Sequence, residues 1–151
     1  MTLEALLAYA HLLAIFTMVV FLASEAALCR VEWLNAAVVE RLGKIDMVYG
    51  IAAGTVLLTG LARVFLGSKG AAFYAHNPLL YLKLVMFLVI GLISIKPTLM
   101  FVRWRRALRA SGALPDAAEI KKARRLVMMQ AHILPFIPLV AVFLARGFSW
   151  V

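Results

Sequence analysis

The sequence predicts an all-α membrane protein, a bundle of four transmembrane helices, and three observations lead to this class. The 151 residues are 65% hydrophobic, with a mean hydropathy of +0.97, which is more apolar than a soluble domain tolerates. Charged residues make up 15% of the chain and are gathered between long apolar runs. Four of these runs are long enough to cross a hydrocarbon core of about 30 Å, which takes roughly 20 helical residues.

The four spans are expected at about 3–29, 45–66, 78–101 and 126–146, and we treat residues 1–151 as one membrane domain. The first apolar run begins MTLEALLAYAH, with an acidic residue and no basic segment before it. A signal peptide has a basic start and a shorter apolar region, so we expect this run to remain as a helix.

The connection between the third and fourth spans, residues 102–125, is expected to be a helical hairpin. Ser111 and Gly112 mark its turn, and Asp116 with Glu119 three residues later reads as the start of a helix. The fourth helix would then run from about 117 to 146, with its regular hydrogen bonding interrupted by two prolines, Pro135 and Pro138.

Charge alternates between the connections. The first, 30–44, holds three basic residues and the third holds eight, whereas the second, 67–77, holds only Lys69. The positive-inside rule then places both termini on the periplasmic side of a bacterial inner membrane, which the chain crosses several times. The basic hairpin is expected to contact lipid headgroups, and no nucleic-acid motif accompanies the net charge of +9.

Lys83 and His11 lie inside predicted spans, where a cation costs roughly 2.5–3.5 kcal/mol and is usually present for a function. At 1.5 Å per residue, His11 lies about 12 Å and Lys83 about 7 Å below the periplasmic edge, with Arg63 at a similar depth. Three such cations repel one another unless an anion lies among them. Heme or another porphyrin with propionates would suit this place, and a lipid headgroup is the competing guest.

Histidine is the usual axial ligand of b-type heme, and helical bundles are its usual scaffold. We expect His11 to be the iron ligand, with Met18 or no residue on the opposite side. His132, in the fourth span, differs from His11 by roughly 9 Å in height, which is awkward for a single iron. A histidine within a membrane also serves about as often as a hydrogen-bonding group between helices.

The cytoplasmic half of the bundle holds a second polar set. Glu25 and Asp46 could pair with Arg103 or His132, which would be a structural role, or could belong to a proton path. In the second span a band of mostly small residues predicts a close helix-packing surface. Its members are Gly50, Ala53, Gly54, Leu57 and Gly60.

Three segments carry a resemblance to known families. They are AYAHLLAIFTMVVFLASEAALCR, YLKLVMFLVIGL and QAHILPFIPLVAVFLARGF. The chain resembles a group of four-helix bacterial integral membrane proteins defined as a domain of unknown function and, more distantly, the HemJ-type protoporphyrinogen oxidases, which bind heme b. The second resemblance implies that His11 holds the heme-ligand position and that Lys83 and Arg30 hold catalytic positions.

The chain departs from the HemJ pattern at two places. Residues 91–93 replace a His–aromatic feature, and Ala131-His132 replaces an Asn-Glu pair, so we expect redox work other than porphyrinogen oxidation. The leading hypothesis is a heme-b-binding membrane oxidoreductase whose partners are lipid, a quinone or a porphyrin, and a second copy of the chain. Its alternatives are a small oligomeric transporter or channel, and an assembly factor without a cofactor.

Overall fold

Four long apolar helices make up the protein. The computed structural model describes residues 2–66 and 76–146, and within them the helices are α1 (Thr2–Leu28), α2 (Ala36–Leu66), α4 (Pro78–Ser111) and a fourth span that divides into α5 (Ala117–Ile133) and α6 (Phe136–Ala145). Each span is longer than the roughly 20 residues that a membrane core requires. The predicted all-α class with four membrane-length helices is therefore confirmed.

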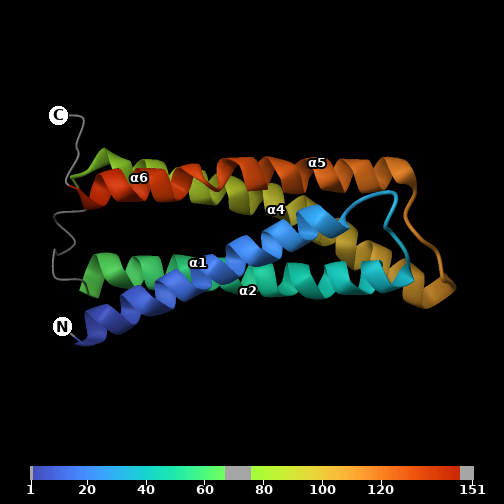
Figure 1. The fold of residues 1–151 in the computed structure, drawn as a ribbon, viewed down its shortest axis with the longest axis horizontal. Coiled ribbons are helices and arrows are strands. Elements are labelled where there is room, and N and C mark those ends of the chain that lie inside the picture. The colour runs from blue at the N-terminus through green and yellow to red at the C-terminus, as the bar shows by residue number, and fades with distance from the viewer. Residues whose placement is uncertain (1, 67–75, 147–151) are drawn as a thin grey trace.

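The helices run side by side along the long axis of the molecule (Figure 1). Both ends of the chain lie at the left in that view, and we call this the termini end. The connections 29–35 and 112–116 lie at the right, at the hairpin end. α1 crosses α2 obliquely and packs along it, α4 packs on α2, α5 and α6, and α1 meets α5 in the hairpin half. Lys69 and most of the second connection lie outside the described residues.

Capping hydrogen bonds from side chains and from the backbone mark where the helices begin and end. The backbone N–H of Glu119 donates to Asp116 Oδ1 at 2.7 Å, which confirms the predicted start of α5. Gly112 ends α4 with a φ of 71° and donates its N–H to the Leu108 carbonyl, a left-handed conformation that favours glycine. α2 begins before the expected membrane span because Asn35 Oδ1 caps it, accepting from Val38 N–H at 3.0 Å.

The two prolines of the fourth span divide it as expected. α5 ends at Ile133 and α6 begins at Phe136, with a turn at the two residues between them. Proline at 138 has no N–H to donate to the Leu134 carbonyl, and that carbonyl instead accepts from Ile137 N–H at 3.1 Å. Pro97, by contrast, lies fully buried inside a continuous α4.

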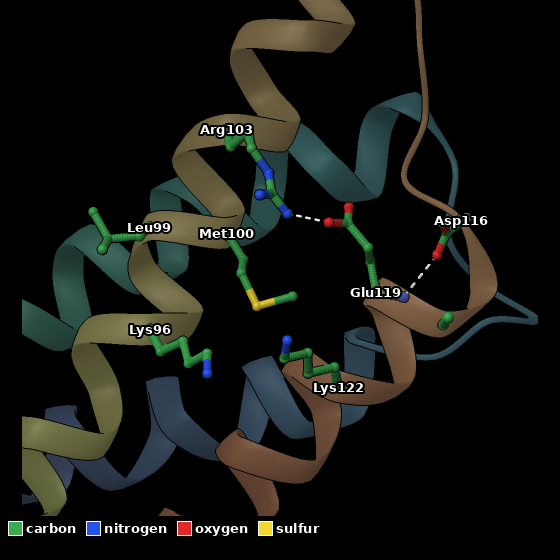
Figure 2. Close-up of a pocket in the computed structure, with 8 residues that line it drawn as sticks. Lys96, Leu99, Met100, Arg103, Asp116, Glu119 and Lys122 are labelled. Carbon is green, nitrogen blue, oxygen red and sulfur yellow. Dashed lines mark hydrogen bonds and ion pairs between the residues drawn. The ribbon is translucent and has the colours of Figure 1, made fainter.

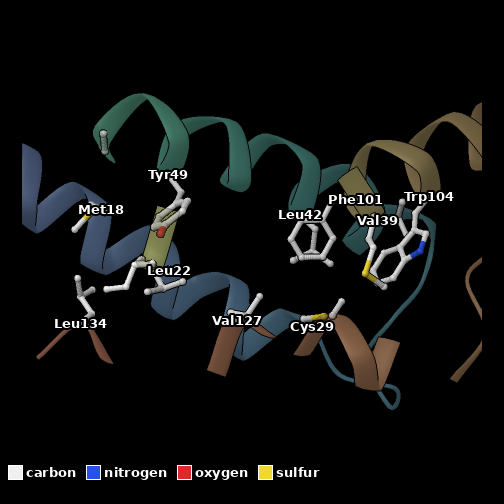
Figure 3. Close-up of a cluster of buried hydrophobic side chains, with 14 of the residues drawn as sticks. Met18, Leu22, Cys29, Val39, Leu42, Tyr49, Phe101, Trp104, Val127 and Leu134 are labelled. Carbon is white, nitrogen blue, oxygen red and sulfur yellow. The ribbon is translucent and has the colours of Figure 1, made fainter. Parts of the chain in front are cut away.

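The main core lies in the hairpin half, where all four spans contribute side chains (Figure 3). Phe101 and Trp104 of α4 pack edge to face, with ring centroids 5.4 Å apart, beside Val39 and Leu42 of α2. A smaller cluster at the termini end joins α4 and α6 through Leu79, Leu80 and Leu144. The larger group of buried side chains therefore joins all four spans, whereas the cluster at the termini end joins only α4 and α6.

Several basic residues at the hairpin end form hydrogen bonds or ion pairs with other residues of the bundle. Glu40 accepts two hydrogen bonds from Arg109, at 2.7 and 2.8 Å, and Glu119 pairs with Arg103. Arg124 of α5 donates to the carbonyl of Ala26 at 2.8 Å, in the last turn of α1. These three arginines therefore have partners within the bundle, and the contact of the remaining basic residues with lipid headgroups stays a prediction.

Cys29 provides a test of how tightly this end closes. The side chain is 0% exposed, and burial, opposed by the Arg124 charge, raises the pKa of its thiol from an ordinary 9.0 to about 12. The thiolate is the reactive form, so at pH 8 the folded protein holds about a thousandfold less of it than the unfolded chain. Maleimide labelling of this single cysteine should therefore be very slow in mild detergent and fast after unfolding in dodecyl sulfate. Rapid labelling of the folded protein would contradict this packing.

Candidate functional site

His11 of α1 is fixed against α2 near the termini end. Its Nδ1 lies 2.8 Å from Thr59 Oγ1, and that hydroxyl donates its own hydrogen to the Thr55 carbonyl at 2.6 Å. Because the hydroxyl hydrogen is already used, Thr59 accepts from Nδ1–H of the imidazole. This assignment leaves the His11 Nε2 lone pair available as an acceptor or a metal ligand.

A glycine makes room for this imidazole. A Cβ atom built on Gly60 would lie 3.3 Å from His11 Cε1, closer than an ordinary contact. The absence of a side chain at position 60 therefore lets α1 and α2 approach at the height of the histidine.

Two cations lie within electrostatic range of this imidazole. Arg63 of α2 and Lys83 of α4 both act on His11 electrostatically, and Arg63 acts on Lys83 in the same way. The arginine is exposed and the lysine partly buried. Salt bridges on Glu40 and Glu119 lie at the hairpin end, away from these two cations.

The other predicted site residues lie elsewhere. Met18 is two turns along α1 from His11, about 10 Å, and is 2% exposed in the core beside Tyr49 and Leu22 (Figure 3). His132 is exposed, and its Nδ1 bonds its own backbone at the Met128 carbonyl, 2.6 Å away. Arg30 lies over the ring of Trp33 at the hairpin end, 5.1 Å from the centroid. The structure does not bring these three residues to His11.

Glu25 and Asp46 do not make the ion pairs that we expected. Arg103 binds Glu119 and His132 binds its own backbone, so neither neutralises the two acids. Asp46 Oδ1 accepts from the Thr98 hydroxyl at 2.8 Å. Glu25 is 1% exposed, and its Oε1 has no hydrogen-bond partner.

Sequence reasoning missed the neutral polar groups around these acids. The Tyr49 hydroxyl donates to Gln130 Oε1 at 2.9 Å, which links α2 to α5 inside the core. Tyr49 follows Asp46 by three residues on one helical face, and Gln130 is a polar residue within an apolar span. These two signals were available in the sequence.

The helices leave hollows between them. A small one of about 140 Å³ lies between α1, α2 and α4 beside Met18, Tyr49 and Thr98. A larger one of about 520 Å³ lies between α4 and α5 at the hairpin end (Figure 2). There the side chains of Lys96 and Lys122 point toward the same space.

A family model described as a predicted membrane protein, DUF2214, matches residues 3–149. The chain belongs to this family. The match includes all four spans and agrees with the first of the two resemblances noted in the sequence. No curated protein and no solved structure matches this DUF2214 protein.

The small-residue band of this DUF2214 protein does not form the packing surface that the sequence predicted. Gly50 and Gly54 are exposed, and a Cβ atom on either would meet no atom within 4 Å. Gly60 alone of the band's glycines approaches a side chain of another helix, that of His11. The helix face turned to α1 is instead offset from the band and contains Tyr49, Ala52 and Val56.

This difference gives a matched pair of variants. Gly60→Leu should displace His11 from Thr59 and lower stability by about 1–3 kcal/mol, because overpacking forces neighbours to move. Gly54→Leu should leave the thermal unfolding midpoint in detergent unchanged, since that position is open. A change of elution volume in Gly54→Leu, without loss of the fold, would favour the alternative of an assembly factor that binds through this face.

Proposed function

We propose that this DUF2214 protein binds heme b at the termini end of the bundle and serves a redox function in the membrane. The observation that carries the proposal is an imidazole fixed through Nδ1 to Thr59, with Val56 as a backbone partner, and with Arg63 and Lys83 within electrostatic range. In this arrangement His11 would hold the iron, and the two cations would receive the propionates. Bound heme would supply one-electron oxidation and reduction.

The hydrogen bonding of His11 fits this role. Histidines that bind metals usually donate the other ring N–H to an oxygen, which fixes the tautomer and the direction of the ring. Thr59 Oγ1 accepts in this way from Nδ1. The orientation is reinforced by Gly60, which allows the ring to lie close to α2.

The cations fit the charge of such a guest. Heme carries two propionates, and the pair Arg63 and Lys83 would neutralise them at the depth of the imidazole. Met18 and His132 lie away from His11, so we propose that the heme iron has one histidine ligand from this chain.

The HemJ resemblance supports heme binding more than it supports porphyrinogen oxidation. His11 and Lys83, which match that family's positions, are within electrostatic range of one another in the termini half. Arg30, the third matching residue, lies about 28 Å along the axis of α1 from His11 and stacks on Trp33. These three residues are too far apart to contact one substrate together. We therefore propose a redox reaction other than porphyrinogen oxidation.

The test is the optical spectrum of protein purified from heme-replete cells. The wild-type protein should show a Soret band, and His11→Ala should abolish it, because the iron loses its ligand. Lys83→Ala should reduce heme occupancy severalfold through the loss of a propionate partner.

Two control variants match these substitutions. His132→Ala removes an exposed histidine bonded to its own backbone, and Lys44→Ala removes an exposed lysine near the hairpin end, so both should retain the band. A colourless, folded wild-type protein would refute the proposal. Flux through liposomes that responds to Lys83→Ala, without a chromophore, would favour the oligomeric transporter instead.

The position in the membrane is part of the same proposal. By the positive-inside rule, the basic residues at the hairpin end favour a cytoplasmic location for that end in a bacterial inner membrane, which would put the heme site in the periplasmic half. A quinone is then a suitable electron-transfer partner for a heme at this depth.

We also propose an anionic phospholipid headgroup as the occupant of the larger hollow, which opens at the hairpin end. Lys96, Lys122 and Arg103 line it, with Glu119 already bound to the arginine and Asp116 capping α5. Basic hollows between helices at this level of a membrane suit lipid phosphates.

Native mass spectrometry should show severalfold less retained cardiolipin for Lys96→Ala/Lys122→Ala. The exposed neighbour Lys121, changed to Ala, is the control, and an equal loss there would indicate unspecific attraction.

A further inference from the structure

Glu25 and Asp46 are two acids in the interior of the bundle that no basic side chain neutralises. Glu25, on α1, is 1% exposed, and Asp46, on α2, is 6% exposed. They lie close enough to act on one another electrostatically. Two buried carboxylates with their charges uncompensated would destabilise the fold by several kcal/mol, so a positive ligand must be bound among them.

Polar side chains of α2, α4 and α5 lie near this pair of acids. Thr98 of α4 donates to Asp46, and Tyr49 of α2 donates its hydroxyl hydrogen to Gln130 of α5. These bonds satisfy part of Asp46 and direct the tyrosine hydrogen away from the acids. The Glu25 Oε1 atom remains without a partner.

The nearest cation of α5 is committed elsewhere. Arg124 donates to the carbonyl of Ala26 at 2.8 Å and lies 3.4 Å from that of Cys29. Its guanidinium therefore caps the end of α1 and does not pair with Glu25. The Cys29 thiol, the remaining titratable group nearby, lies 3.8 Å from the Ile120 carbonyl, and its charged form is anionic.

We propose that Glu25 and Asp46 form a proton-binding site in which the two buried acids together hold one exchangeable proton. The ligand is a proton because the surrounding oxygens are few and mostly committed, whereas a metal cation requires about six oxygen ligands. The site is separate from His11, about 21 Å away along α1, and stands whether or not heme is bound there.

The small hollow supplies a route to this site. Thr98 and Tyr49 form part of its wall, and Thr98 is also the residue that donates to Asp46. A volume of about 140 Å³ holds several waters, at roughly 30 Å³ for each. Gly50 and Gly91, which complete part of the lining, are exposed, so the hollow opens at the surface between α2 and α4. Through Thr98 the hollow therefore reaches the hydrogen-bond partner of Asp46, and this is the route that we propose for proton exchange.

The experiment is labelling of the full-length protein in mild detergent with dicyclohexylcarbodiimide, followed by peptide mass spectrometry. This apolar reagent reacts with protonated carboxyl groups in apolar surroundings. At pH 7, labelling at Glu25 or Asp46 should exceed labelling at Glu40 at least tenfold, because Glu40 is partly exposed and ion-paired with Arg109. Labelling should fall as the pH rises and this proton is lost.

Each outcome decides the proposal. Labelling of Glu25 or Asp46 that equals that of Glu40, or no labelling of either while the protein remains folded, would overturn it. Protection by sodium ions at constant pH would also overturn it and identify a metal-cation site. Glu25→Gln should remove the label at position 25, and Asp46→Asn should change its pH dependence. The wild-type measurement does not depend on either variant folding.

Discussion

Polar groups in a bundle surrounded by lipid must find partners within the protein, and this constraint governs the whole structure. Hydroxyl side chains along the helices meet it by donating to the carbonyl one turn earlier, as Thr17, Ser24 and Thr55 do. Tyr49 and Gln130 meet it across two helices. Against this background, an unsatisfied atom such as Glu25 Oε1 indicates a ligand more strongly than it would in a soluble protein.

The two halves of the bundle satisfy the constraint differently. The hairpin half closes around aromatic and aliphatic side chains, and its arginines bind carboxylates or carbonyls of neighbouring helices. The termini half concentrates His11, Arg63 and Lys83 beside a smaller apolar cluster. The larger buried core and the His11 region thus lie in different parts of the bundle, with the two buried acids beside the core.

Much of this arrangement could be predicted because it depends on local sequence. Span lengths follow from hydropathy, the start of α5 follows from Asp116 and Glu119, and the break near Pro135 follows from the missing N–H. The similar depth of His11 and Lys83 could also be estimated, since depth can be counted at 1.5 Å per residue.

The rest could not be predicted because it depends on how each helix is rotated against its neighbours. Periodicity identifies the face on which Glu25 lies, but it does not reveal which helix covers that face or whether an arginine reaches it. For the same reason the Gly50 and Gly54 band was assigned to packing, although α2 turns that face outward. The partners of Arg103 and Arg124 depend equally on which helices are adjacent.

The contact between Arg124 and the last turn of α1 has a consequence for biogenesis. α1 leaves the ribosome first, yet the guanidinium that completes its final carbonyls belongs to the fourth span, 98 residues after Ala26. Until that span has inserted, the end of the first helix depends on water or lipid headgroups for its hydrogen bonds. The end of α1 is therefore completed only after α5 has been made, which couples completion of this part of the bundle to the arrival of the fourth span.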